Sequence, residues 1–286
     1  MEPNIVILAG GISSRMKQQA SASSTLDASL RKDAQEKSKA MIGVGDDSRP
    51  FLDYLLYNME RAGYEDVVIV VGERDDSIRR RYEGDEGEHL SRSMKISYAV
   101  QKIPAGRTKP LGTADALLEA LEANPGWKGR KLTVCNSDNL YSITSLRLLR
   151  MDSHDNAMID YDRSALIFNQ ERITQFAVIK KDARGFLQDI IEKPSEDDIT
   201  LATDSSGRIG VSMNFFRFSY DAIYPFLVSI PLHPVRQEKE LPLAVKMMVE
   251  RYPGSMFTIP LSEHVPDLTT QSDILEVRSY LAKEFK

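Results

Sequence analysis

Short apolar runs alternate with amphipathic segments through the first half of the chain. Four β-branched runs indicate buried strands, and they occupy residues 4–9, 66–72, 95–100 and 131–136. Between them, residues 50–63 and 112–123 place apolar side chains at helical spacing, and the first of these begins with proline and ends with glycine. Alternating strands and helices predict a Rossmann-like α/β fold: a mixed, mostly parallel central sheet with helices on both faces.

The second half of the chain is expected to be richer in strands. Strands are expected at residues 165–168, 175–180, 186–192 and 209–218. Helices are expected around residues 220–228, 239–251 and 271–283. Because no internal repeat and no clean linker divides the sequence, we expect a single domain over residues 1–286 with a β-rich second half.

Residues 18–38 differ in composition from the rest of the chain. The segment is rich in alanine, serine and charged residues and contains no aromatic residue. Such a composition offers little apolar surface to a core. We therefore expect a mobile or partly helical insertion that lies outside the core.

Composition narrows the class of protein. Hydrophobic residues make up 42% and charged residues 28% of the 286 residues, as in ordinary globular proteins. A formal charge of −5 gives no general attraction for nucleic acid or an anionic membrane. Cys135 is the only cysteine, so no internal disulfide forms, and no segment has the form of a signal peptide or a membrane span. We expect a cytoplasmic protein with neither nucleic acid nor membrane as a partner.

Two polar segments follow predicted strands. Gly10 and Gly11 end the first strand, and residues 137–139 end the fourth. Parallel sheets bind ligands at the carboxyl ends of their strands. A glycine pair lets the backbone approach a phosphate, and Arg15 adds a forked cation that suits phosphate oxygens. The alternative is a glycine-rich turn beside an exposed arginine, because short glycine motifs occur often by chance.

The segment LAGGISSRM at residues 8–16 resembles the opening motif of the sugar-phosphate nucleotidyltransferases, L-A-[AG]-G-x-G-[ST]-R-[LM]. Ser13 stands where the later glycine usually does, a variant that is similar to molybdopterin guanylyltransferases. The resemblance implies a GT-A-like fold with Arg15 on the β- and γ-phosphates. It assigns nucleotide binding to Leu8, Ala9, Gly10, Gly11, Ser14 and Arg15.

Two further segments resemble nucleotide-binding motifs of that family. Lys39, in SKAMIGV, aligns with the lysine that neutralises triphosphate charge, although the family usually has proline where Ser38 stands. QKIPAGRTKPLGTADAL, residues 101–117, resembles the segment that holds base and ribose. There Gln101 is expected to meet a base edge through both amide groups. Gly112 would let the ring lie against the backbone, and Thr113 would either bind nucleotide or cap the following helix.

The resemblance also implies a metal site. Asp138, in VCNSDN, follows a buried strand as the family's G-D aspartate does, with Ser137 in place of the glycine. Asp267, in DLTTQSD, resembles the family's second metal carboxylate. Mg²⁺ takes oxygen ligands, often one or two carboxylates together with phosphate oxygens. We therefore expect Asp138 and Asp267 to converge on Mg²⁺, with Asp138 also counted among the nucleotide-binding residues.

Acceptor-binding residues are implied by motifs of the second half. IIEKP resembles the family's E-K-P, with Glu192 on sugar hydroxyls and Lys193 on the sugar's phosphate. VSMNFFRF, which contains Asn214, resembles a motif of an uncharacterised bacterial branch of the family, as do GRTKP at 106–110 and KELPL at 239–243. We therefore divide the domain into a nucleotide-binding half (1–140) and an acceptor-binding half (141–286).

Together the motifs imply a Mg²⁺-dependent nucleotidyltransferase that moves NMP from an NTP to a sugar 1-phosphate and releases pyrophosphate. Arg15, Lys39 and Lys193 would supply the catalytic charges. The partners would be the triphosphate and a phosphorylated small molecule, and members of the family are often homo-oligomers. Two alternatives stay open: a cytidylyl- or guanylyltransferase for a non-sugar phosphate, and an inactive nucleotide-binding regulatory protein. The sequence leaves the base and the acceptor open.

Overall fold

The computed structural model describes residues 2–17, 26–83 and 93–285. Within them, a ten-stranded sheet has the strand order β3-β2-β1-β4-β9-β5-β8-β6-β7, with β10 pairing beside β5. The strands are β1 (Asn4–Leu8), β2 (Asp66–Gly72), β3 (Lys95–Gln101), β4 (Lys131–Asn136), β5 (Ala157–Asp162), β6 (Val178–Lys181), β7 (Leu187–Ile191), β8 (Gly210–Val211), β9 (Phe216–Ser219) and β10 (Phe257–Leu261). This is the expected mixed α/β fold.

The first half of the sheet is parallel, as predicted. β1 lies between β2 and β4 and pairs in parallel with both, and β2 pairs in parallel with β3. Alternate residues of β1 enter two different cores, Ile5 and Ile7 on one face and Val6 and Leu8 on the other. Because both faces are covered, the strand is apolar from Ile5 to Leu8.

The second half of the sheet is largely antiparallel. β9 enters between β4 and β5 and is antiparallel to both, whereas β5 and β10 pair in parallel. The strand expected at 209–218 consists of two short strands, β8 and β9, separated by four residues. The strand expected at 165–168 is wrong, because a 3-10 helix, Arg163–Ala165, turns the chain there and no strand follows.

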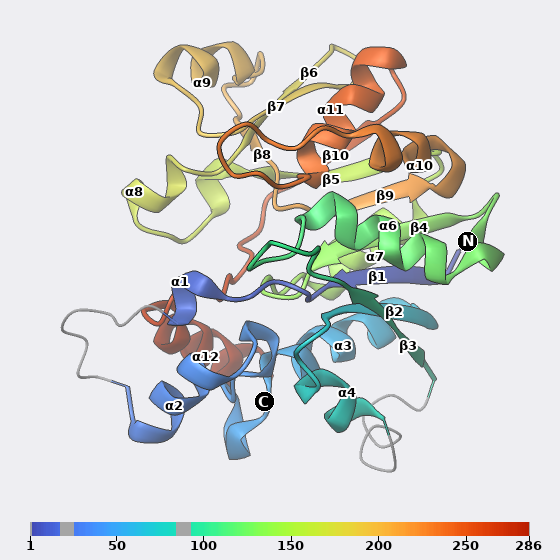
Figure 1. The fold of residues 1–286 in the computed structure, drawn as a ribbon. Helices are drawn as coiled ribbons and strands as arrows, with labels where there is room; N and C mark the ends of the chain where they lie inside the picture. Colours follow the sequence, from blue (N-terminus) through green and yellow to red (C-terminus); the bar gives the residue numbers. More distant parts are fainter. Residues whose placement is uncertain (1, 18–25, 84–92, 286) are drawn as a thin grey trace.

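Helices cover both faces of the sheet (Figure 1). They are α1 (Ser14–Lys17), α2 (Ala28–Glu36), η1 (Lys39–Met41), α3 (Phe51–Ala62), α4 (Ser77–Tyr82), α6 (Thr113–Ala123), α7 (Ile143–Met151), α8 (Gln170–Ile173), α9 (Glu196–Ala202), α10 (Tyr220–Ser229), α11 (Leu241–Arg251) and α12 (Asp273–Glu284). Buried residues of α2, α3, α7 and α12 share one core, and those of α6, α10 and α11 share the other. The expected end of α3 is confirmed, since Gly63 adopts a left-handed conformation there.

The proposed insertion at 18–38 is partly helical, as expected, but part of it belongs to the core. Asp27 caps α2 by accepting a hydrogen bond from the Leu30 backbone at 2.8 Å. Leu26, Leu30 and Ala34 are buried in the same core as α3. The expectation that this segment lies outside the core is therefore wrong for α2, because one apolar stripe suffices to dock a short helix. Residues 18–25 lie outside the described part of the chain.

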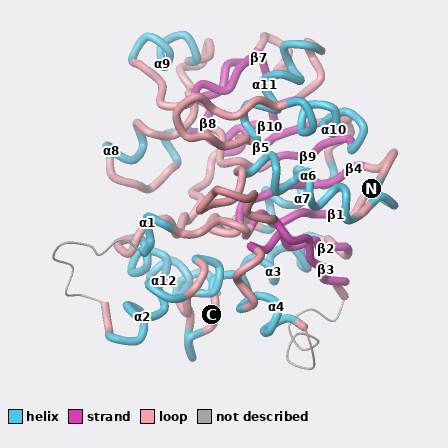
Figure 2. The backbone as a smooth tube through the Cα atoms, viewed as in Figure 1, coloured by secondary structure: helices cyan, strands magenta, loops and turns pink. Residues whose placement is uncertain are grey.

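The only tryptophan of the sequence, Trp127, is buried near the amino ends of the parallel strands. Its indole Nε1 donates a hydrogen bond to the Asp66 carboxylate at 3.1 Å, and Asp66 is the first residue of β2. The opposite, carboxyl ends of the strands lead into loops, and Figure 2 shows the loop after β1 leaving the sheet toward α1. In the described residues, no helix combines the length and apolarity that crossing a membrane requires.

Candidate active site

A cavity of about 440 Å³ opens at the carboxyl ends of β1, β3 and β4. This volume suits a small-molecule ligand. Most residues that the sequence assigned to nucleotide binding line it, namely Leu8, Ala9, Gly10, Gly11, Arg15, Gln101, Gly112, Thr113 and Asp138. Segments far apart in sequence therefore meet at the edge of the sheet where the topology predicts a ligand site.

The loop after β1 shows why its motif usually contains a second glycine. Ser13, at that position, has a φ of +57°, in the left-handed region that L-residues rarely adopt. Its hydroxyl accepts a hydrogen bond from the Lys39 backbone N–H at 3.3 Å, which ties the loop to η1. Arg15 is exposed and lines the cavity from α1, whereas the side chain of Ser14 lies outside what the structure describes.

Gln101 ends β3 with its side-chain amide held in one orientation. Its Nε2 donates to the Gly112 carbonyl at 2.8 Å and to the Asp115 carboxylate at 2.9 Å, so both amide hydrogens are used. A Cβ on Gly10 would lie only 2.9 Å from Gln101 Oε1. The expectation that both amide groups meet a base edge is therefore wrong here, because Asp115 leaves only the acceptor oxygen available.

The turn before α6 brings the two halves of the chain together. Gly112 has a φ of +107°, and a Cβ there would lie 2.7 Å from the Lys239 carbonyl. Thr113 is the first residue of α6, and its hydroxyl accepts a hydrogen bond from the Leu241 backbone at 2.9 Å. It forms no cap on its own helix, so the capping alternative is wrong and the residue instead links α6 to α11.

The two aspartates assigned to the metal lie on adjoining segments. The Leu268 N–H donates to the Asp138 carbonyl at 2.8 Å, and Asn139 forms an antiparallel bridge with Asp267. Lys39 Nζ lies 2.7 Å from Asp138 Oδ2, and both side chains are mostly buried. The backbone thus brings together two carboxylate-bearing residues that lie far apart in the sequence.

Asp267 does not line the main cavity. It lines a second cavity of about 590 Å³ together with Phe168 and His264. Its Oδ2 lies 2.6 Å from Arg172 Nη2, and its Oδ1 accepts a hydrogen bond from the Thr269 hydroxyl at 2.7 Å. Burial raises the pKa of the Asp267 carboxyl, and nearby Asp138 raises it further, whereas Arg172 lowers it.

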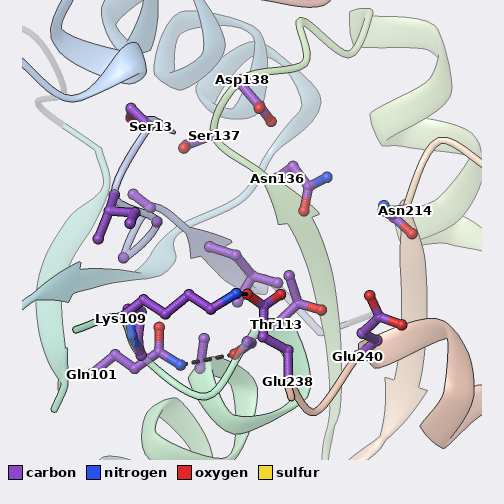
Figure 3. A pocket seen from close by; sticks show the side chains of 18 of the residues that line it. Ser13, Gln101, Lys109, Thr113, Asn136, Ser137, Asp138, Asn214, Glu238 and Glu240 are labelled. Carbon is purple, nitrogen blue, oxygen red and sulfur yellow. Dashed lines mark hydrogen bonds and ion pairs between the residues drawn. The ribbon is translucent and has the colours of Figure 1, made fainter. Parts of the chain in front are cut away.

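The acceptor-binding residues are only partly brought to the main cavity. Glu192 and Asn214 line it, and Figure 3 shows Asn214 across the cavity from Gln101. Lys193 is exposed, has a φ of +49°, and is not among the residues that line the cavity. The structure therefore leaves the role assigned to Lys193 a prediction.

Sequence reasoning did not assign four charged residues of the cavity to the site. Lys109 Nζ lies 2.5 Å from Glu238 Oε1, and Arg236 pairs with Glu240. All four line the cavity, and Figure 3 shows Lys109 beside Glu238. The sequence feature that could have identified these residues is the pair of motifs GRTKP (106–110) and KELPL (239–243), because the segments that carry them meet at this cavity.

The donor set fits a cation that takes few protein ligands. In the described ranges, no three or more histidine, cysteine, aspartate or glutamate side chains are grouped to hold a metal ion. Asp138 offers one carboxylate in the main cavity, and Asp267, on the adjoining segment, offers a second one that lines the other cavity. Mg²⁺ accepts such a site, because water and substrate phosphates complete its octahedron.

Comparisons with known proteins show the family and the fold. The family model described as nucleotidyl transferase matches residues 33–224. A glucose-1-phosphate adenylyltransferase of Anaeromyxobacter dehalogenans is 24% identical over 185 residues, which are 62% of this chain and 42% of that protein. The bifunctional protein GlmU of Staphylococcus epidermidis is 21% identical over 252 residues, 87% of this chain and 46% of that protein. The chain thus spans less than half the length of these relatives.

A solved structure shares the fold over almost the whole chain. It is a UDP-glucose pyrophosphorylase complexed with UDP-glucose, and it superposes with a TM-score of 0.71. The match covers 99% of this chain and all of that one at 17% sequence identity. Identity at this level shows a common fold and leaves substrates to be argued from the site.

Proposed function

Because the chain belongs to the nucleotidyl transferase family, we propose that it transfers NMP from an NTP to a sugar 1-phosphate and releases pyrophosphate. The first half of the domain, residues 1–140, would bind the triphosphate, and the second half, residues 141–286, would bind the acceptor. The names of the relatives support this reaction, since they include a glucose-1-phosphate adenylyltransferase and a UDP-glucose pyrophosphorylase.

One observation carries the proposal: Asp138 lines a glycine-lined cavity together with Arg15 and Lys39, and Asp267 lies on the segment that bridges to the neighbouring Asn139. The reaction brings a phosphate anion onto the α-phosphorus of a polyanion, so charge must be neutralised before the atoms approach. The attacking phosphate is already anionic near neutral pH and needs no strong general base. Positioning and electrostatics therefore supply most of the catalysis.

The site residues have separate tasks in this reaction. Arg15, which is exposed on α1, would bind the β- and γ-phosphates of the incoming nucleotide. Lys39 would bind near the α-phosphate and keeps Asp138 oriented meanwhile. Asp138 and Asp267 would hold Mg²⁺, which when bound adds positive charge next to the phosphates. Glu192 and Asn214 would orient the acceptor.

The test is pyrophosphate release by the full chain with Mg²⁺, using each of the common NTPs against a set of sugar 1-phosphates and non-sugar phosphates. We expect at least one sugar 1-phosphate to react. Turnover only with non-sugar phosphates would favour the cytidylyl- or guanylyltransferase alternative. Nucleotide binding without pyrophosphate release from any pair would favour a regulatory protein and overturn the proposal.

A variant pair links that activity to the site. Asp138→Ala should lower kcat on the order of 10²–10³-fold, the usual effect of losing one main electrostatic contact. Asp155→Ala is the matched control, because Asp155 is highly exposed and pairs with Lys131. Normal turnover in a folded Asp138→Ala protein would remove Asp138 from the mechanism.

A further inference from the structure

We propose that Arg172 is a built-in counter-ion of Asp267 and that a divalent cation entering the site takes its place. The inference rests on the proposed function in one respect, since it takes Asp267 to be a metal ligand. Arg172 belongs to no motif of the sequence, and it reaches Asp267 across 95 residues of chain from the short helix α8.

Both oxygens of Asp267 are already engaged. Oδ2 pairs with Arg172 Nη2 at 2.6 Å, and Oδ1 accepts from the Thr269 hydroxyl at 2.7 Å. Each oxygen keeps a second lone pair, so the two hydrogen bonds do not themselves block a metal ion, but the charge of the metal acts differently on the two partners. The guanidinium repels a divalent cation and the hydroxyl does not, so Arg172 is the partner expected to leave.

The fold gives a reason for the counter-ion. The Asp267 side chain is only 12% exposed and adjoins Asp138. Two neighbouring carboxylates without cations would repel each other, and a buried unpaired charge is costly. Lys39 neutralises Asp138 and Arg172 neutralises Asp267. The site thus remains folded and charge-balanced before any metal arrives.

Arg172 also pairs with a second carboxylate, that of Asp273. Its Nη1 contacts Asp273, whose Oδ2 is fixed by the Thr269 and Thr270 N–H groups at 2.8 and 2.6 Å. The guanidinium can release Asp267 and stay on Asp273, so the exchange needs only a small movement. The guanidinium carbon of Arg172, Cζ, also lies 4.5 Å from the centre of the Phe168 ring, and Phe168 lines the second cavity. Metal entry is thereby coupled to α8 and to the wall of that cavity.

The experiment is a Mn²⁺ titration of the full chain, with free Mn²⁺ measured by electron paramagnetic resonance. Arg172→Gln should bind Mn²⁺ more tightly than the wild type by roughly 5- to 150-fold, the range of ordinary site-to-site coupling. Arg172→Lys should fall between them, because one ammonium cannot hold two carboxylates as a guanidinium fork does. Arg184→Gln, at an exposed arginine paired with Asp182, should leave the affinity unchanged.

Hydrogen exchange gives a readout that does not depend on affinity. Saturating Mn²⁺ should speed amide exchange in a peptide spanning residues 166–176 of the wild type, and it should have little effect on that peptide in Arg172→Gln. Slower exchange there, or Arg172→Gln binding Mn²⁺ no better than the wild type, would overturn the counter-ion role. If Arg172→Gln fails to fold, the wild-type exchange and Arg172→Lys decide the question by themselves.

Failure of the metal site itself has a different signature. Asp267→Asn should abolish most Mn²⁺ binding. If it binds Mn²⁺ like the wild type, or if the wild type binds none, Asp267 is not a metal ligand, and that part of the proposed function fails together with this inference. If Asp267→Asn loses Mn²⁺ while Arg172→Gln is unchanged, the metal site stands and only the counter-ion role is wrong.

Discussion

Replacing Asp115 with alanine should weaken nucleotide binding while leaving the chemical step intact. Asp115 accepts one of the two Nε2 hydrogens of Gln101, and the Gly112 carbonyl accepts the other. An ionised carboxylate is only an acceptor, so it forces Oε1 of Gln101 toward the cavity. Without Asp115, the amide is held by one neutral hydrogen bond and is freer to turn.

The size of the effect follows from this geometry. A buried hydrogen bond to a charged group contributes about 1.5–3 kcal/mol, and each 1.4 kcal/mol is about tenfold in an equilibrium. The bond to Gly112 remains and favours the same orientation, so we expect the lower end of that range. The KM for the preferred NTP should rise about tenfold, with kcat nearly unchanged because the base lies away from the reacting phosphorus.

Steady-state pyrophosphate release gives both constants. Asp115→Asn should have a smaller effect than Asp115→Ala, because its amide oxygen can still accept from Nε2. Glu122→Ala is the matched control, since Glu122 is exposed on the same helix. An unchanged KM in a folded Asp115→Ala protein, or a loss confined to kcat, would refute the idea that Asp115 orients Gln101 for binding.

Three further results are expected. Burial, aided by Arg172, lowers the pKa of His264 from 6.5 to about 4. The unfolded chain therefore takes the proton first, and the free energy of unfolding should fall as the pH drops from 6.5 to about 4. Urea unfolding should show a flatter pH dependence in His264→Gln. Burial raises the pKa of the Cys135 thiol, so iodoacetamide at pH 8 should label only the urea-unfolded chain, and native labelling would contradict the burial. In Gly112→Ala the new Cβ would lie 2.7 Å from the Lys239 carbonyl, so thermal unfolding should show the folded protein destabilised by about 1–3 kcal/mol. Gly126→Ala is the control and should match the wild type, because a Cβ there meets nothing within 4 Å.

The parallel half of the fold was predictable because its signals are local. Strand β1 is apolar from Ile5 to Leu8, and Gly10 and Gly11 follow shortly after it, so its carboxyl end is marked in the sequence. The same holds for β4 and the polar residues after it. Since parallel strands bring their carboxyl ends to one edge, the meeting of these loops at a cavity followed from topology alone.

Two strands of the second half were missed for physical reasons. The apolar pattern of β5 is interrupted by Asp160, which is fully buried because Lys181 and Arg208 neutralise it at 2.7 and 2.6 Å. Those partners come later in the chain, so the local pattern looks polar. β10 contains Pro260, which an edge position tolerates, and among the strands of the described residues it pairs with β5.

The missed site residues have the same explanation. Arg172 meets Asp267 and Asp273 across 95 and 101 residues of chain, and nothing near it in sequence announces either contact. The Lys109–Glu238 pair spans 129 residues. Motifs identify residues whose neighbours in sequence share their task, whereas a charge held by a distant partner becomes visible only after the chain has folded.

The place of Trp127 decides what intrinsic fluorescence will report. The indole is buried against the first residue of β2, at the end of the sheet opposite the cavity. Its emission maximum should therefore shift to longer wavelength when the parallel half of the sheet unfolds. It should change little when a ligand binds in the cavity at the other end. A titration followed by tryptophan emission would miss occupancy altogether, and a ligand with its own optical signal is the better choice.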